Sequence, residues 1–185
     1  MKRVILTGLA TVGIVALSAF TSVTGKVTSK KSHLSFFSHT DVEDISADNY
    51  KAVSTLDAST GAVVFSVPMQ SFEFDKSLMQ KHFNSPKFLD TKQFPKAKFK
   101  GNIIDLTKVH FDKDGTYQTT VEGDMTLHGE TKNIKEKISV IVKGDEVNVK
   151  SKFNLTLADY KIAFENGKPA TNIAKTVEVT IDVFY

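Results

Sequence analysis

The sequence contains no cysteine and no tryptophan, and only four of its 185 residues are proline. Without cysteine the chain has no disulfides and no thiolate ligands for a metal, so its stability must come from a packed core. A chain of this length folds as one domain and can bury a sizeable core.

The usual motifs of catalytic and metal sites are also missing. The sequence has no Gly-x-Ser-x-Gly motif, and no carboxylate pair stands in a recognisable acid/base setting. We therefore expect no enzymatic activity, no metal and no cofactor. The histidines are scattered, without the i, i+4 spacing of a helical metal site, at His33, His39, His82, His110 and His128.

Charge of one sign is not concentrated anywhere. The formal net charge is +3, and without Lys2 and Arg3 there remain 22 basic residues against 21 acidic ones. The lysines are spread along the chain instead of forming a patch. This distribution predicts that nucleic acid is not a partner.

The first twenty residues have the pattern of a secretory signal peptide. A short basic start precedes an apolar run from Val4 to Phe20, with small residues near its end. We predict a signal peptide at 1–20, a flexible entry segment at 21–31, a barrel domain at 32–185, and a periplasmic or secreted mature protein. The entry segment is either a linker or the ragged entry to a first strand. A retained membrane anchor is the alternative, because the run just reaches the roughly 17 residues that a spanning helix needs.

The rest of the chain mostly alternates apolar and polar side chains, which is typical of antiparallel strands with one buried face. Turns containing glycine separate the runs, for example at 112–115 and 128–130. We count about eight long strands joined in up-and-down order. This order predicts an all-β, closed antiparallel barrel, because closure removes exposed strand edges. Eight strands enclose enough space for one small ligand.

An outer-membrane barrel is an alternative that the polar faces exclude. They carry Lys, Glu and Asp over the whole length of the strands. A lipid-facing Lys near the middle of the bilayer costs about 2–4 kcal/mol, and this chain would have many. We therefore expect the apolar face to point into the barrel, and the mature protein not to be integral to a membrane.

The stretch 72–99 interrupts the strand pattern and contains six of the fourteen phenylalanines. Asp75 is a suitable N-cap for a short helix that Asn84-Ser85-Pro86 would end. Leu78, Met79, His82 and Phe83 share one face of this helix and are predicted to point inward. An aromatic helical insert between strands either plugs the barrel or lines its cavity.

Several segments resemble the YceI-like family. These are 65–72, 78–84, 88–91 and 94–101, together with 153–155 and 159–162. Gly123 to Lys132 is similar to a hairpin motif of the same family. The resemblance extends from about residue 27 to 185. The stretch from Val27 to Leu34 departs from the family's usual opening.

The resemblance implies a lipocalin-like barrel, export to the periplasm, and binding of a polyisoprenoid or another long apolar chain. A long isoprenoid or other lipid is then the expected partner. The expected walls of the apolar cavity are Phe65, Phe72, Phe74, Leu78, Met79, Phe83, Phe88, Phe99, Met125 and Phe153. A polar head group would meet Lys81, His82, His128 and Lys132, for which a solvated surface position is the alternative.

Two other functions compete with a carrier. The chain can be an envelope stress or interaction protein whose barrel is filled by its own Phe side chains. A catalyst acting on quinone-like or prenylated molecules ranks below both. A monomer and a homodimer are the two alternatives for the oligomeric state.

Overall fold

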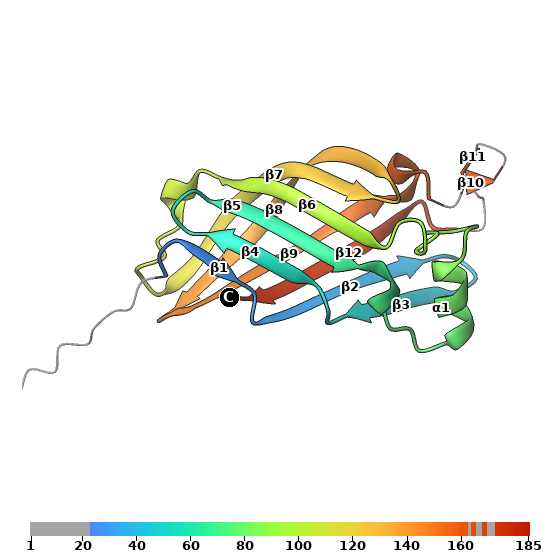
Figure 1. The fold of residues 1–185 in the computed structure, drawn as a ribbon, viewed down its shortest axis with the longest axis horizontal. Helices are drawn as coiled ribbons and strands as arrows, with labels where there is room; N and C mark the ends of the chain where they lie inside the picture. Colours follow the sequence, from blue (N-terminus) through green and yellow to red (C-terminus); the bar gives the residue numbers. More distant parts are fainter. Residues whose placement is uncertain (1–22, 163, 166–167, 170–172) are drawn as a thin grey trace, which may run out of the picture.

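The computed structural model describes residues 23–162, 164–165, 168–169 and 173–185. The predicted signal peptide at 1–20 therefore lies outside the described residues. The described chain is a strongly curled antiparallel sheet (Figure 1). Its ten strands are β1 (Lys26–Thr28), β2 (Lys31–His39), β3 (Asp44–Asn49), β4 (Val53–Asp57), β5 (Ala62–Pro68), β6 (Lys96–Ile104), β7 (Gly115–Leu127), β8 (Glu130–Lys143), β9 (Glu146–Thr156) and β12 (Thr176–Phe184).

The prediction of an all-β antiparallel fold is confirmed, but the strand count is ten and not eight. The first two long strands are each divided, into β1 with β2 and β3 with β4. Lys26 lies opposite Asp57 and Leu34 lies opposite Asn49, so both pairings keep the register of a single hairpin. At each break the inward-facing positions change from odd-numbered to even-numbered residues. Val27 is followed by Leu34 in the first strand, and Ala47 is followed by Leu56 in the second. Strand β1 lies within the segment 21–31, which we had expected to be either a linker or the ragged entry to a first strand.

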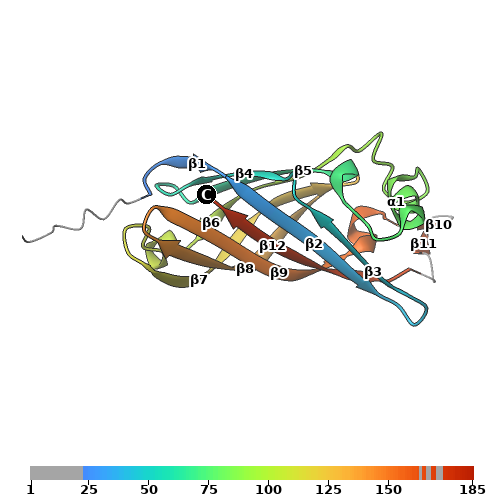
Figure 2. The same cartoon turned by 90° about the horizontal axis from the view of Figure 1, so that it is seen from below.

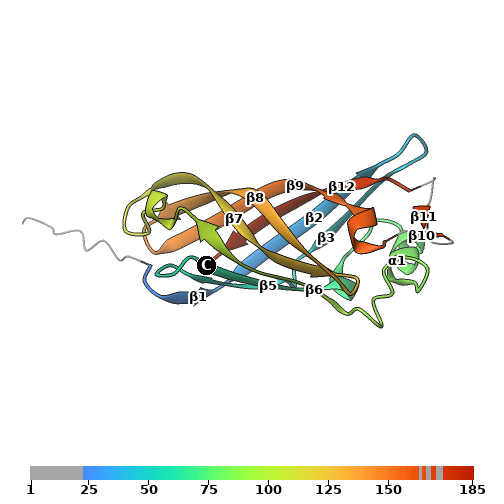
Figure 3. The same cartoon turned by 90° about the horizontal axis from the view of Figure 1, so that it is seen from above.

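The divided hairpin brings the two edges of the sheet together. The strands follow the order β1-β4-β5-β6-β7-β8-β9-β12-β2-β3, so that β1 is at one edge and its chain neighbour β2 pairs with β12 near the other. Between β1 and β2, the Ser29 amide donates to the Ser54 carbonyl at 2.8 Å and the Lys30 amide donates to the Phe184 carbonyl at 2.8 Å. The sheet thereby wraps round an interior, as Figures 2 and 3 show from below and above.

One end of the interior is a packed core. Leu56, Val140, Val147 and Val183 are fully buried there. They come from β4, β8, β9 and β12, because alternate residues of each strand point inward. These buried side chains form the floor of the interior, and Leu56 also borders the cavity above it.

The opposite end carries the helical segments (Figures 1 and 3). Helix α1 (Ser77–Asn84) and the short η1 (Met69–Ser71) belong to the insert between β5 and β6, and η3 (Leu157–Tyr160) follows β9. The remaining elements are η2 (Leu106–Lys108) and a separate two-stranded pair of β10 (Phe164–Glu165) and β11 (Lys168–Pro169).

The predicted helix exists, but Asp75 is not its cap. The N-cap position is Lys76, and no side chain caps the first turn. Ser85 is the C-cap, directly before Pro86, which ends the helix where the sequence predicted.

Candidate functional site: an apolar cavity in the barrel

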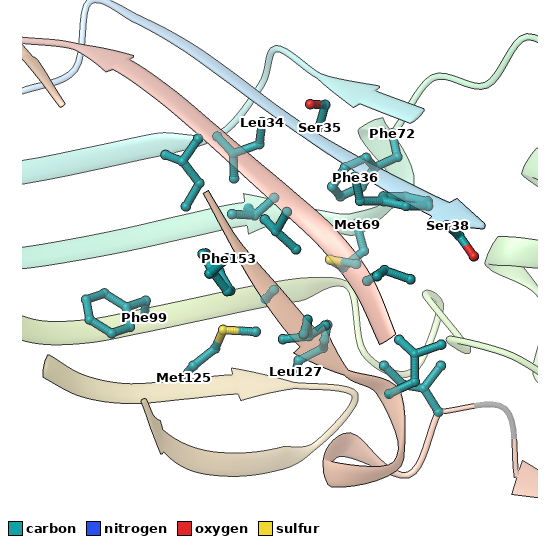
Figure 4. A pocket seen from close by; sticks show the side chains of 18 of the residues that line it. Leu34, Ser35, Phe36, Ser38, Met69, Phe72, Phe99, Met125, Leu127 and Phe153 are labelled. Carbon is teal, nitrogen blue, oxygen red and sulfur yellow. The ribbon is translucent and has the colours of Figure 1, made fainter. Parts of the chain in front are cut away.

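The site is a cavity of about 490 Å³ inside the curled sheet, on the helical side of the packed core. Its walls are mostly Phe, Leu, Ile, Val and Met side chains from the inward faces of the long strands and from the insert. Figure 4 shows Leu34, Phe99, Met125 and Phe153 around it. Tyr185, which follows β12, lines it next to the packed core.

The structure places nine of the ten predicted wall residues at the cavity. They are Phe65, Phe72, Phe74, Met79, Phe83, Phe88, Phe99, Met125 and Phe153. The tenth, Leu78, does not line it and is 57% exposed. Met79 and Phe83 are one turn apart on α1, and both line the cavity. The adjacent position 78 faces solvent.

The residues predicted to contact a head group are not gathered at one place. His82 borders the cavity and is otherwise exposed, whereas Lys81 and Lys132 are exposed and do not line it. His128 is a turn residue with a positive φ of 50°. Its Nδ1 lies 3.0 Å from the carbonyl oxygen of Tyr160, and its ring meets Phe94 edge-on at 4.8 Å, so its contacts hold the hairpin turn to η3.

Phe83 is the centre of an aromatic cluster at the helical end. Its ring centroid lies 5.0 Å from that of Phe74, 5.5 Å from that of Phe72, and 5.7 Å from that of Phe36, on which it stacks. Phe36 was missed by the sequence reasoning, although Ser32, Leu34 and Ser38 on the same strand face show that even-numbered residues of β2 point inward. These rings pack on one another and also border the cavity, so they close one end without filling the barrel.

The mouth lies between the β2–β3 loop and α1. Thr40, Val42 and Glu43 of the loop line the cavity, and Val42 is also 89% exposed, which marks the boundary between cavity and solvent. An ion pair from the Lys76 ammonium to the Glu43 carboxylate joins the loop to the start of α1. Glu43 is the main cause of the raised pKa of Lys76.

At the floor the Tyr185 hydroxyl and the Ser54 hydroxyl are 2.5 Å apart and buried. Burial raises the pKa of Tyr185 to about 12, against the opposing effect of the hydrogen bond from Ser54. The pair ties β4 to the residue after β12 and satisfies both hydroxyls where no water reaches them.

One carboxyl group stands inside the cavity. Glu136 on β8 lines it between the inward-facing Ile134 and Ile138. Burial raises the pKa of Glu136. The sequence reasoning did not single out this residue, although its position in the alternation of β8 was visible.

Neither a metal-binding group of side chains nor a membrane-spanning helix is found among the described residues. They contain no group of three or more His, Cys, Asp or Glu side chains placed to hold a metal ion. In the same part of the chain, no helix is both long and apolar enough to cross a membrane.

The sequence is similar to one domain family over nearly its whole length. This family is the YceI-like domain, and the match covers residues 10–185. A UPF0312 protein of Vibrio cholerae serotype O1 is 32% identical over 88 residues, which are 48% of this chain and 43% of the relative. The aligned part thus spans less than half the length of the curated relatives.

Three solved structures share the fold. A polyisoprenoid binding domain from Saccharophagus degradans superposes with a TM-score of 0.71 at 15% identity, over 88% of this chain and 98% of that one. Burkholderia cenocepacia BcnA superposes with a TM-score of 0.68 at 14% identity, over 83% of this chain and 96% of that one. A Campylobacter jejuni YCEI protein superposes with a TM-score of 0.57 at 14% identity, over 100% of this chain and 98% of that one. At such identities the likeness shows the fold alone.

Proposed function

The chain belongs to the YceI-like domain family, and from this premise we propose that it is an exported carrier of a long apolar ligand. The ligand is a polyisoprenoid or a similar isoprenoid or fatty amphiphile, held in the barrel for transport or storage. The observation that carries the proposal is the apolar cavity of about 490 Å³. Small-molecule sites in proteins have volumes of roughly 300–1,000 Å³ and mostly apolar walls.

Burial alone can supply the affinity. Each CH₂ group moved from water into an apolar site contributes about 0.8 kcal/mol, so a long chain needs few hydrogen bonds. Phe65, Phe99 and Phe153 offer large rigid surfaces, and Met125 can adapt its shape to an irregular chain. Binding of this kind is non-covalent and requires no catalytic residue, in keeping with a carrier and not an enzyme.

Passage of the ligand requires an opening, and the mouth beside α1 provides it. The loop residues Thr40 and Val42 face Met79 and His82 of α1 across the same cavity. Movement of the insert away from the loop, with rupture of the Glu43–Lys76 ion pair, would admit a chain lengthwise. The solved domain from Saccharophagus degradans, which is described as polyisoprenoid binding, supports an isoprenoid as the ligand.

The rival interpretation is an interaction protein with a barrel filled by its own side chains. The aromatic cluster round Phe83 fits that interpretation at the mouth. The space deeper in the barrel, bordered by Phe99, Met125 and Phe153, does not.

A matched pair of substitutions on β12 tests the carrier. Val179 lines the cavity between Phe153 and Phe36, whereas Thr180, its neighbour on β12, is not among the residues that line it. Val179→Phe should reduce binding of a fluorescent long-chain fatty or prenyl probe at least about tenfold by occupying its space, and Thr180→Phe should leave binding unchanged. Equal effects of both variants, or no binding by the wild type, would contradict the proposal.

A further inference from the structure

Six large apolar side chains are exposed in the described part of the chain, and the two most exposed lie beside the mouth of the cavity. Val42 in the β2–β3 loop is 89% exposed, and Leu78 on α1 is 57% exposed. The other four are between 41% and 51% exposed, at Phe37, Tyr50, Val53 and Val64. Single exposed residues of this kind are ordinary, but a pair beside one opening indicates a contact surface.

The loop and the helix lie together at one end of the molecule. Figures 1 and 2, which are at right angles, both show the β2–β3 loop and α1 at the same end of the long axis. The Glu43 carboxylate, next to Val42, binds the Lys76 ammonium, two residues before Leu78. This ion pair holds the two exposed side chains on either side of the mouth. We call this surface the mouth face, and it consists of residues 40–44 of the loop and residues 76–82 at the start of α1.

The mouth face continues the apolar lining of the cavity to the outside. Val42 lines the cavity and is at the same time almost fully exposed. On α1, Met79 lines the cavity and its neighbour Leu78 faces solvent. A ligand that leaves between the loop and the helix therefore passes from an apolar wall to an apolar rim. Such a rim gains nothing from contact with water and is stabilised by contact with hydrocarbon.

Charged side chains of both signs surround the two apolar ones. Asp41 precedes Val42 in the loop, Lys81 lies one turn beyond Leu78 on α1, and both are exposed. This arrangement matches a zwitterionic lipid surface, where lysine meets the phosphate groups, aspartate meets the ammonium groups, and apolar side chains reach the acyl boundary. The mouth face holds three acidic residues and two lysines, so it has no excess of positive charge with which to select anionic lipids.

We propose that the mouth face docks on the surface of a lipid bilayer, with Val42 and Leu78 inserted at the boundary between head groups and acyl chains. The cavity then opens directly onto the bilayer, and an apolar ligand moves between the two without crossing water. Insertion of two side chains gives weak and reversible attachment, as a carrier that leaves the membrane requires. The inference rests on the proposed function and adds the partner with which the ligand is exchanged.

The absence of tryptophan from the chain allows a direct test. Val42→Trp and Leu78→Trp each place a single tryptophan in the mouth face. Val64→Trp is the matched control, because Val64 is exposed on β5 and does not line the cavity. With phosphatidylcholine vesicles, we expect the emission of the first two variants to shift to shorter wavelength and to be quenched by brominated acyl chains. The emission of Val64→Trp should stay unchanged.

Transfer kinetics test the consequence of docking. A fluorescent long-chain fatty probe held in phosphatidylcholine vesicles should enter the wild-type protein at a rate that rises with vesicle concentration. Leu78→Ser should lower this rate about tenfold, because it removes one of the two inserted side chains. The affinity for the probe without vesicles should stay the same, since Leu78 does not line the cavity. Val64→Ser should alter neither quantity.

The outcomes separate docking from the carrier function. If neither tryptophan responds to vesicles, or if transfer does not depend on vesicle concentration, docking is wrong and the carrier stands. A response that requires anionic phosphatidylglycerol in the vesicles also overturns the proposal. A wavelength shift that grows with protein concentration in the absence of vesicles would mean that a second copy of the chain covers the mouth face. If the wild type takes up no probe from any source, the proposed function fails, and the tryptophan emission still reports whether the face binds lipid.

Discussion

Gly101 on β6 lies directly opposite Gly123 on β7, and neither position has room for a Cβ atom. A Cβ on Gly123 would lie 2.3 Å from the Cα of Gly101, and one on Gly101 would lie 2.6 Å from the ring of Phe99. The glycine pair therefore lets two strands approach closely and lets the Phe99 ring lie along the wall.

Replacing either glycine should destabilise the fold. For Gly123→Ala we expect a loss of about 1–3 kcal/mol in the free energy of unfolding, because the new methyl group meets backbone atoms that cannot move aside. Urea denaturation measures this loss. Gly144→Ala is the control, since its site has a positive φ of 59° but nothing within 4 Å, so only the conformational strain of about 1 kcal/mol should appear. A smaller loss at Gly123 than at Gly144 would contradict the steric explanation.

Removing the Tyr185 hydroxyl should change how stability depends on high pH. Tyr185→Phe breaks the hydrogen bond to Ser54 and should cost about 1–2 kcal/mol at neutral pH. The folded-state pKa of Tyr185 is raised to about 12, so above the ordinary value of 10.0 the unfolded chain loses its proton first and the wild type loses stability. Tyr185→Phe lacks this loss. The difference between the two proteins in urea denaturation should shrink between about pH 10 and pH 12, and a constant difference would argue against burial of the hydroxyl.

Glu136 should make the protein less stable as the pH rises through the acidic range. Burial raises its folded-state pKa above the ordinary value of 4.5, so between these two values the folded protein holds more protons than the unfolded chain. Stability linked to this group is complete below the unfolded pKa and falls as pH rises through the folded one. In the absence of ligand, Glu136→Gln should therefore gain thermal stability relative to the wild type from about pH 4 to pH 7. The reverse trend would mean that the carboxylate has a favourable partner in the folded state.

Breaking the ion pair at the mouth should change the rates of ligand exchange and leave the affinity unaltered. Lys76→Gln removes the link between the β2–β3 loop and α1. Because the link does not touch the deeper walls, association and dissociation of a long-chain probe should accelerate by the same factor in stopped-flow measurements. Lys92→Gln, on the same insert but outside the cavity lining, should alter neither rate. Unchanged rates in both variants would place the passage elsewhere.

Much of the fold could be predicted because the strands obey one simple rule. In β8 and β9 the buried residues Ile138, Val140, Val147 and Val149 recur at every second position, and the hairpin turns contain glycine. Four of the nine confirmed wall residues lie on strands and obey this alternation. The other five belong to the insert, where the resemblance to the family indicated them. Leu78 lies about 100° around the helix axis from Met79, outside the face that Met79 and Phe83 turn towards the cavity, and it is exposed.

Features that depend on the meeting of distant segments could not be predicted. Ser54 and Tyr185 are 131 residues apart, and nothing local indicates that their hydroxyls meet. The pairing of β8 with β9 stops partway along both strands, at a point that the composition of neither strand shows. Glu136 is in phase with Ile134 and Ile138, so its inward direction could be read from the alternation, but only the closed sheet shows the cavity beside it.

Native mass spectrometry of the protein purified from its own host, without added lipid, tests the central claim most directly. A carrier with this apolar cavity should retain a co-purifying ligand of defined mass, and Val179→Phe should have lost it while Thr180→Phe keeps it. The released ligand should be a long-chain isoprenoid or fatty compound. Wild-type protein that is ligand-free in every preparation, and that binds no long-chain probe afterwards, would contradict the carrier and favour a barrel that serves only as an interaction scaffold.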